Sequence, residues 1–316
     1  MSVVEATSPG GVDFTLREMV DQYEATLALM NAAANRITAK ISGADKHPSV
    51  INDALAGNTY YARLSLAKKT LEVAMSQEIV GHPVYEWAIG VPGLNRVTIS
   101  RVVALIPMTE PSHFYEFSRL QSFAGYAPGK DKLVRGQKAT FNPRLKKALF
   151  VAIDTVLKSS GVVDNRPTRP ERLYSEIYVN WRRKYAQRHG VGEKGRAWLK
   201  RRGFKEDVRD YDEYLIENNR PVLKDGEPAP VWPDPRQHSA ARRKALIYML
   251  AHLWRVWRTN LGWDYRPMYF HEQLHHEFQE DCWLYHSSVL ADKKRRERFS
   301  MPELDQNELD DLADEY

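Results

Sequence analysis

Two segments place basic side chains beside the predicted start of a helix. In the first, Ile89–Arg96, a Pro92-Gly93 turn leads into an apolar stretch. In the second, Lys130–Lys147, basic residues surround Asn142-Pro143, a good cap residue followed by the residue favoured at the first helical position. A helix start has free N–H groups and a positive dipole end, so it binds phosphate readily. Both segments therefore predict contact with a nucleic-acid backbone.

The helix expected to begin at Pro143 has basic residues where its dipole disfavours them. Arg144, Lys146 and Lys147 lie in or beside its first turn, a position at which acidic residues are more usual. A bound external anion would offset this mismatch, and the plainer alternative is a solvated basic turn. The other helix start, Val91–Asn95, is similar to a helix-hairpin-helix turn. Asn95 stands at its second glycine and is expected to adopt the left-handed angles that Asn tolerates.

A further basic cluster lies between Trp181 and Glu206, where ten Lys and Arg residues face only two acidic ones. Aromatic residues are interleaved with them, namely Tyr178, Trp181, Tyr185, Trp198 and Phe204. Cations bind phosphates and planar rings stack on unpaired bases, so the cluster favours nucleic acid. Some of these rings follow helical spacing and are equally suited to a core.

The segment His271-Glu272-Gln273-Leu274-His275 fits the zinc-protease pattern, in which a helix presents both imidazoles to one metal beside a general base. Third ligands could come from His276, Asp281, Cys282 or His286. The chain offers no sheet to support such a helix, and Phe278 stands where the metzincin extension has glycine. A zinc-dependent hydrolase and a structural metal site remain alternatives, and an amphipathic surface helix is favoured. No cofactor and no catalytic residue are expected.

The net charge is +5, and the last fourteen residues, Glu303–Tyr316, contain seven acids and no base, so the rest of the chain is more basic still. The acidic end could compete with nucleic acid for the basic surfaces or simply solubilise the chain. A single cysteine, Cys282, rules out an intrachain disulfide. No secretory leader and no membrane-spanning apolar run are found. These features predict a cytoplasmic protein without a membrane partner.

The first strong helix is predicted over Phe14–Ile41, after an Asp13 cap. It carries an unbroken heptad seam formed by Leu16, Val20, Tyr23, Leu27, Met30, Ala34, Ile37 and Ile41. A second helix is predicted from about Asn52 to Val80, with a weaker seam formed by Tyr61, Leu64, Lys68, Leu71 and Met75. Together they predict an antiparallel coiled-coil hairpin over residues 14–82. This hairpin could pack on its own domain or pair with a second copy.

The remaining chain is also expected to be helical, because no segment alternates apolar and polar residues as a strand would. The predicted fold is all-α, with a flexible start at 1–13, the hairpin at 14–82, a helical domain at 83–262 and a C-terminal segment at 263–316. Within the domain, Pro143 starts a helix that buries Leu145, Leu149, Ala152 and Val156. The stretch from Pro167 to Arg202 is a further helical region, and Ser239–Thr259 is a last strong helix with Leu246, Leu250, Leu253 and Trp257 on its apolar face. A Pro-rich loop at 220–238 lies between them.

The order of several short motifs resembles the C-terminal domain of bridge-RNA-guided insertion-sequence transposases that have an N-terminal DEDD RuvC-like domain. The motifs lie within Glu86–Gly262, a little over half of the chain, and are Val91–Leu94, Phe117–Leu120, Phe123–Pro128, Asn142–Leu149, Ala240–Lys244 and His252–Arg258. Those transposases have a nucleophilic serine between the Gly-x-Ala-Pro turn and the following helix, whereas Phe123–Lys158 contains no serine. A helical arm stands where their RuvC-like domain would be. The recombinase chemistry is therefore not carried over.

The helical arm followed by this domain is similar to the Nop architecture of box C/D ribonucleoproteins. It is more similar still to the Nop-domain Tas proteins of tandem-interspaced-guide-RNA systems, some of which lack an attached nuclease. The resemblance implies a prokaryotic or viral homodimer that binds a guide RNA and lets it pair with target DNA, with any nuclease encoded separately. The alternative is a transposase-derived DNA-binding protein without RNA.

Charge and placement, and not family position, select the candidate nucleic-acid-binding residues. They are Arg96, Arg119, Lys130, Lys132, Arg135, Lys138, Asn142, Arg144, Lys146, Lys147, Arg182, Arg183, Lys184, Arg188, Arg196, Lys200, Arg201, Arg202, Arg242, Arg243 and Lys244.

Overall fold

The computed structural model describes residues 14–41, 47–129, 136–159, 162–163, 166–167, 173–189, 232 and 234–266. Most of these residues are helical, which confirms the all-α prediction. The elements are α1 (Phe14–Lys40), α2 (Pro48–Ala56), α3 (Thr59–Glu78), η2 (Ile79–Gly81), α4 (Tyr85–Gly90), α5 (Arg96–Ala104), α6 (Phe117–Phe123), α7 (Pro143–Ser159), β1 (Val162–Val163), β2 (Arg166–Pro167), α8 (Leu173–His189) and α11 (Asp234–Asn260). The β1–β2 pair is a short antiparallel ladder that the sequence did not predict.

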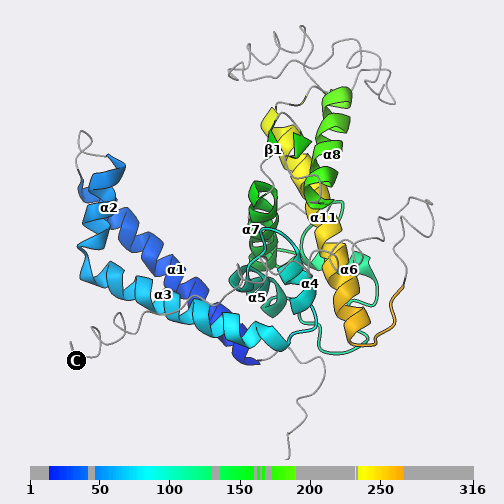
Figure 1. The fold of residues 1–316 in the computed structure, drawn as a ribbon, viewed down its shortest axis with the longest axis horizontal. Coiled ribbons are helices and arrows are strands. Elements are labelled where there is room, and N and C mark those ends of the chain that lie inside the picture. The colour runs from blue at the N-terminus through cyan, green and yellow to red at the C-terminus, as the bar shows by residue number, and fades with distance from the viewer. Residues whose placement is uncertain are drawn as a thin grey trace, which may run out of the picture.

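Two antiparallel helix pairs extend from a central group of short helices (Figure 1). The first pair is α1 with α3, and the second is α8 with the N-terminal half of α11. Helices α4, α5 and α7 lie between the two pairs, and α11 runs along this group with α6 packed against it. The long helix α11 therefore joins the second pair to the central group.

The heptad seam predicted for the first helix is turned toward the rest of the chain. Leu16, Val20, Tyr23 and Met30 are buried, and Leu27 is partly buried against the same core. The Tyr23 hydroxyl donates to Glu72 of α3 at 3.0 Å. The seam is thus used within one chain, where the burial of its apolar side chains stabilises the pair.

The prediction of one continuous helix from about Asn52 to Val80 was wrong, because this stretch contains two helices. The chain breaks at Gly57-Asn58, and the Asn58 side chain accepts a hydrogen bond from the Tyr61 N–H at 2.9 Å. Asn58 therefore caps α3 and separates it from the shorter α2. Of the seam predicted for α3, Met75 is buried and Leu71 is partly buried against the core, whereas Tyr61, Leu64 and Lys68 are half-buried.

The turn between α4 and α5 lies against the end of α7. Gly93 has φ +94°, and a Cβ at this position would lie 2.6 Å from the Thr155 carbonyl oxygen and 2.7 Å from the Val156 Cα. The prediction that Asn95 adopts left-handed backbone angles was wrong, because its backbone is extended (φ −121°, ψ 168°). Its side chain accepts from the Thr98 N–H at 2.7 Å and caps α5. The turn thus serves packing within the chain.

Helix α7 confirms the prediction made for it. Asn142 accepts hydrogen bonds from the N–H groups of Arg144 and Leu145, both at 3.1 Å, and so caps the helix. The four residues predicted to be buried on this helix are buried, namely Leu145, Leu149, Ala152 and Val156. This face packs against α5, α8 and α11 and leaves the opposite face free to carry polar side chains.

Helix α11 begins earlier than predicted, at Asp234, inside the stretch expected to be a Pro-rich loop. Its predicted apolar residues Leu246, Leu250, Leu253 and Trp257 are all buried. Two hydroxyl–imidazole contacts join it to α8, at 2.8 Å between Tyr174 and His252 and at 2.8 Å between Tyr178 and His238. The α8–α11 pair is therefore joined by polar contacts as well as apolar ones.

Arg258, at the end of α11, is fully buried and holds two loop segments to the helix. Its guanidinium donates to the carbonyl oxygens of His113 at 2.7 Å, Pro111 at 2.8 Å and Asp264 at 3.0 Å. Burial lowers the pKa of this side chain from its ordinary value. The acceptors compensate for the removal of the guanidinium from water, which would otherwise be costly.

Candidate nucleic-acid interface

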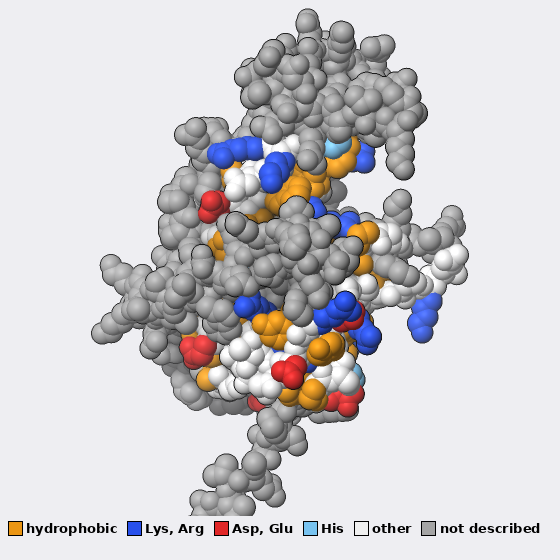
Figure 2. Space-filling model, turned by 90° about the vertical axis from the view of Figure 1, so that its right-hand side faces the viewer, with side chains coloured by type: hydrophobic (Ala, Val, Ile, Leu, Met, Phe, Trp, Pro, Cys, Tyr) orange, Lys and Arg blue, Asp and Glu red, His pale blue; other side chains and the backbone are white. Residues whose placement is uncertain are grey.

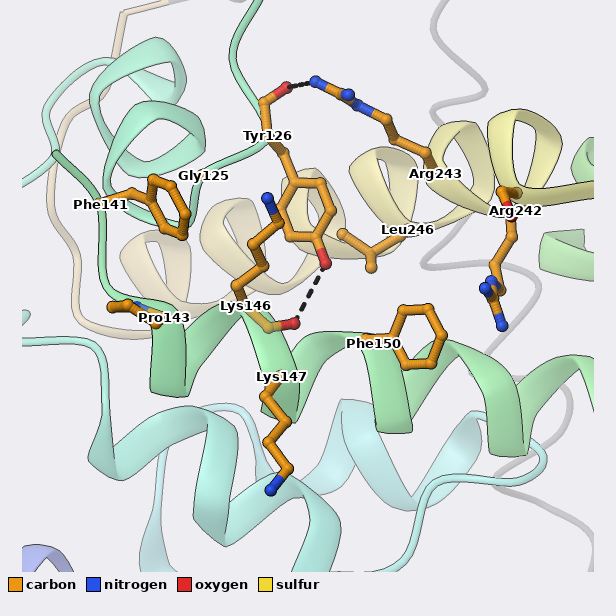
Figure 3. A pocket seen from close by; sticks show the side chains of 11 residues that line it. Gly125, Tyr126, Phe141, Pro143, Lys146, Lys147, Phe150, Arg242, Arg243 and Leu246 are labelled. Carbon is orange, nitrogen blue, oxygen red and sulfur yellow. Dashed lines mark hydrogen bonds between the residues drawn. The ribbon is translucent and has the colours of Figure 1, made fainter. Parts of the chain in front are cut away.

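A pocket of about 500 Å³ lies where the loop before α7 meets the N-terminal halves of α7 and α11. Figure 3 shows the side chains that surround it. They are Gly125, Tyr126 and Phe141 from the loop, Pro143, Lys146, Lys147 and Phe150 from α7, and Ser239, Arg242, Arg243 and Leu246 from α11. Its volume falls within the range of about 300–1,000 Å³ that is usual for small-molecule sites.

The loop side of the pocket depends on one glycine. Gly125 has φ +74°, and a Cβ there would lie 2.6 Å from the Phe141 ring. The Asn142 N–H donates to the Phe123 carbonyl at 2.8 Å, which closes the loop and brings the two segments together. Glycine at this position therefore lets Phe141 lie directly over the turn and form a wall of the pocket.

Tyr126 is held by three neighbouring elements. Its hydroxyl donates to the Lys146 carbonyl at 3.1 Å, and its own carbonyl accepts from Arg243 at 3.0 Å and from Gln121 at 3.2 Å. Burial raises the pKa of the Tyr126 hydroxyl despite the nearby Arg243 and Arg242. The ring is consequently a fixed, protonated part of the wall.

Cations lie close to the aromatic rings of the pocket. The Lys146 ammonium is 4.5 Å from the centroid of Phe141 and 5.7 Å from that of Tyr126. The Arg242 guanidinium carbon is 3.8 Å from the centroid of Phe150. Phe150 is 43% exposed, so part of its side chain is accessible from solvent. The pocket thus combines positive charge with an accessible aromatic surface.

The charge of the pocket is positive. Lys146, Lys147, Arg242 and Arg243 line it, and none of the described residues that line it is acidic. Arg242 has an acidic partner in Asp154, whose carboxylate lies 3.3 Å from Arg242 and 2.7 Å from Lys158. The hydrogen bond from Lys158 lowers the pKa of Asp154, so this carboxylate stays ionised. Asp154 orients Arg242 and offsets only part of the positive charge.

A second cationic and aromatic group lies on the α8–α11 pair. The ammonium of Lys184 is 5.0 Å and that of Lys244 is 4.6 Å from the centroid of Trp181. Burial, with Arg243 nearby, lowers the pKa of Lys244. Lys184 of the predicted 181–206 cluster and Lys244 of α11 therefore meet at one indole ring.

Arg144 was expected to meet an external anion, but the structure provides internal ones. Its guanidinium donates to Glu24 of α1 at 2.7 Å and forms an ion pair with Asp21. These carboxylates account for a basic residue in the first turn of α7. Arg96 is also directed inward, since it donates to the Ser76 carbonyl at 3.5 Å and lies over the Tyr85 ring. Neither residue lines the pocket.

Arg182 was predicted to belong to a basic surface cluster, and this prediction was wrong because the residue is buried. Only 3% of the residue is exposed, because it lies on the buried stripe of α8. Its neighbours Arg183 and Lys184 are exposed. The basic run is therefore divided between the interior and the surface.

Other predicted residues are exposed away from the pocket lining or lie outside the described part of the chain. Arg119 and Lys138 are exposed, and Asn142 acts as a cap. The residues outside the described ranges are Lys130, Lys132, Arg135, Arg196, Lys200, Arg201, Arg202, His271, Glu272 and His275, and the side chain of Arg188 is likewise not described. No group of three or more metal-ligating side chains occurs among the described residues.

The aromatic walls of the pocket were not predicted from the sequence. Phe150 lies four residues after Lys146, so the two share one side of α7, at the edge of its exposed face and beside Leu145 and Leu149. A large aromatic residue on the polar face of an amphipathic helix was the available signal. Tyr126 and Phe141 gave no comparable signal, because their approach depends on the fold of the loop.

On the face shown in Figure 2, the Lys and Arg side chains of the described residues form several groups separated by apolar and uncharged ones. Within the described ranges, no helix combines the length and apolarity needed to cross a bilayer. Comparison with protein-family models, curated proteins and solved structures found no match to this chain. The function must therefore be inferred from the residues of the chain itself.

Proposed function

We propose that this protein is a non-catalytic RNA-binding protein that holds a guide RNA and directs the complex to complementary DNA. The observation that carries the proposal is the pocket between α7 and α11, which is lined by four cations and three aromatic rings. Cations attract the phosphate backbone, and rings bind bases that are not stacked in a duplex. The guided role comes from the resemblance of the helical arm followed by the helical domain to Nop-domain Tas proteins.

The charge of the pocket comes from residues far apart in the chain. Lys146 and Lys147 belong to α7, whereas Arg242 and Arg243 belong to α11. Packing of the two helices brings these like charges into one pocket and raises the local positive potential. A positive pocket attracts a polyanionic ligand, and this supports a binding role for the pocket.

The non-catalytic part of the proposal rests on the sequence. The segment Phe123–Lys158, which would carry the nucleophile in the transposases, contains no serine. Cutting of a target would then require a nuclease encoded elsewhere. The alternative, a DNA-binding protein without RNA, predicts the same salt dependence but no bound RNA.

Dimerisation through the arm is part of the proposal, and it requires a surface other than the heptad seam. That seam is already buried within the chain. Leu29 of α1 is 49% exposed and Tyr60 of α3 is 52% exposed. A second copy would have to use such outward-facing residues.

The experiment is a titration of fluorescent single-stranded RNA with the full chain at several salt concentrations. Affinity is expected to fall steeply between about 50 and 200 mM salt, because binding releases counterions. Replacing Lys146 and Lys147 together by Gln should weaken binding and reduce the salt slope by about 1 to 2. Loss of these cations near a helix N-terminus does not disfavour folding.

The matched control replaces Arg63 and Lys69 of α3 by Gln, which removes the same charge from exposed positions on the arm. This variant should retain most of the affinity. The proposal is overturned if the chain does not bind RNA at low salt, or if the pocket and control variants bind equally well.

A further inference from the structure

The exposed ring of Phe150 is the feature of the pocket that phosphate binding leaves unexplained. Lys and Arg alone suffice to attract a duplex backbone, whose bases present only their edges in the grooves. An aromatic ring that is 43% exposed within a cationic pocket serves a ligand with an accessible planar face. In a polynucleotide, such a face belongs to a base that is not stacked in a duplex.

The pocket has a volume of about 500 Å³, which is in the usual range for a small-molecule site and sufficient for one base. The Arg242 guanidinium covers one face of Phe150 at 3.8 Å, and Asp154 holds that guanidinium in place. In Figure 3, Phe150 and Leu246 face the space that Tyr126 closes on its other side. An apolar floor and an aromatic wall are suited to a flat heterocycle.

Two cations, Lys146 and Arg243, line the same pocket as the Phe150 ring. Lys146 rises from α7 toward the Tyr126 ring, and Arg243 reaches the same residue from α11 (Figure 3). A phosphate alone would not use the rings, and a free apolar ligand would not use the cations. The combination matches a nucleotide, which has a planar base and an anionic group.

We infer that the pocket between α7 and α11 binds a single unpaired nucleotide of a polynucleotide, with its base against Phe150 and its phosphate beside Lys146 and Arg243. The inference rests on the proposed function, because the polynucleotide brings the nucleotide to the pocket. It adds that the protein distinguishes a strand with an unpaired nucleotide from a fully paired one. Unpaired DNA offers the same chemistry, so both polynucleotides are tested.

The experiment compares two RNA hairpins that differ by one bulged 2-aminopurine, together with the same two hairpins in DNA. The full chain should bind the bulged form roughly tenfold more tightly, since stacking on an aromatic ring contributes about that much per base. Binding should also quench the 2-aminopurine fluorescence. Phe150→Ala should remove the preference without changing affinity for the paired hairpin, and Phe150→Trp should retain it.

The matched control is Tyr60→Ala, which removes an equally exposed ring from the arm and should keep the preference. Equal affinity for bulged and paired hairpins, in both RNA and DNA, overturns the inference but leaves the proposed function intact if binding is salt-dependent. Equal loss of affinity for both forms in Phe150→Ala also overturns it. Absence of binding to every hairpin at low salt overturns the proposed function as well.

Discussion

Arg144 and Glu24 are 120 residues apart in the chain, yet the Nε of Arg144 donates to the Glu24 carboxylate at 2.7 Å. Arg101 of α5 donates to the other oxygen of the same carboxylate at 3.2 Å. One acidic residue of α1 therefore joins α5 and α7. This ion-pair group, with Asp21, fixes the arm to the central helices.

Arg144→Ala should lower the free energy of unfolding by about 1 kcal/mol, because the pair is partly exposed and Glu24 keeps Arg101. The same substitution should change the affinity for RNA little, since the guanidinium is held by internal carboxylates. Urea denaturation and RNA titration measure the two effects. A large loss of RNA affinity with unchanged stability would show instead that Arg144 contacts the ligand.

Arg258→Met should be far more damaging, although it replaces the charge with an apolar chain of similar length. The carbonyl groups of Pro111, His113 and Asp264 would lose their donor in a buried place. The expected loss is about 3–5 kcal/mol in the free energy of unfolding. Arg255→Met on the same helix is the control, because Arg255 is half-buried and donates to the Tyr265 hydroxyl. Equal losses in the two variants would contradict the role given to Arg258.

Gly93→Ala tests the packing of the α4–α5 turn against α7. A Cβ would lie 2.6 Å from the Thr155 carbonyl oxygen, and φ is +94°, so strain and collision should together cost about 3 kcal/mol. Gly129→Ala is a matched control, because its φ is +73° but nothing lies within 4 Å of its Cβ. That variant should cost only about 1 kcal/mol. Thermal or urea unfolding that ranks the two equally would refute the close approach.

His82 makes stability depend on pH. Burial lowers its pKa from 6.5 to about 4, and its ring lies 4.6 Å from that of Trp257. The unfolded chain therefore binds a proton at a higher pH than the folded chain, so the stability contribution is complete above pH 6.5 and is lost as pH falls toward 4. At about pH 5 the loss is roughly 2 kcal/mol. His82→Gln should reduce the pH dependence of the unfolding free energy by that amount, and an unchanged profile would contradict it.

Several features could be predicted because their causes are local. The heptad seam of α1, the Asn142 cap and the buried face of α7 follow from spacing alone. A spacing pattern in the sequence also pointed to the burial of Arg182. It shares one face of α8 with Ser175, Tyr178 and Ala186 at helical spacing, and all four residues are buried. The density of charge in the segment concealed that pattern.

Other features depend on contacts that sequence spacing does not contain. The pairing of Arg144 with Glu24 requires the arm to return to α7, and the pocket requires α7 to meet α11. Asn95 could have formed a left-handed turn or a helix cap, and both roles are common for asparagine. The packing of Gly93 on α7 decides in favour of the cap. The cationic residues that line the pocket were thus among the residues selected from the sequence, whereas its aromatic residues were not.

A specific bound RNA distinguishes the proposed function from every alternative. To detect it, the full chain is isolated from its native cells, and the bound nucleic acid is extracted and sequenced after separate digestion with RNase and DNase. We expect one discrete, short RNA species that RNase removes and that is depleted when Lys146 and Lys147 are replaced by Gln. Protein free of RNA, or protein bound only to heterogeneous DNA, would refute the proposed function.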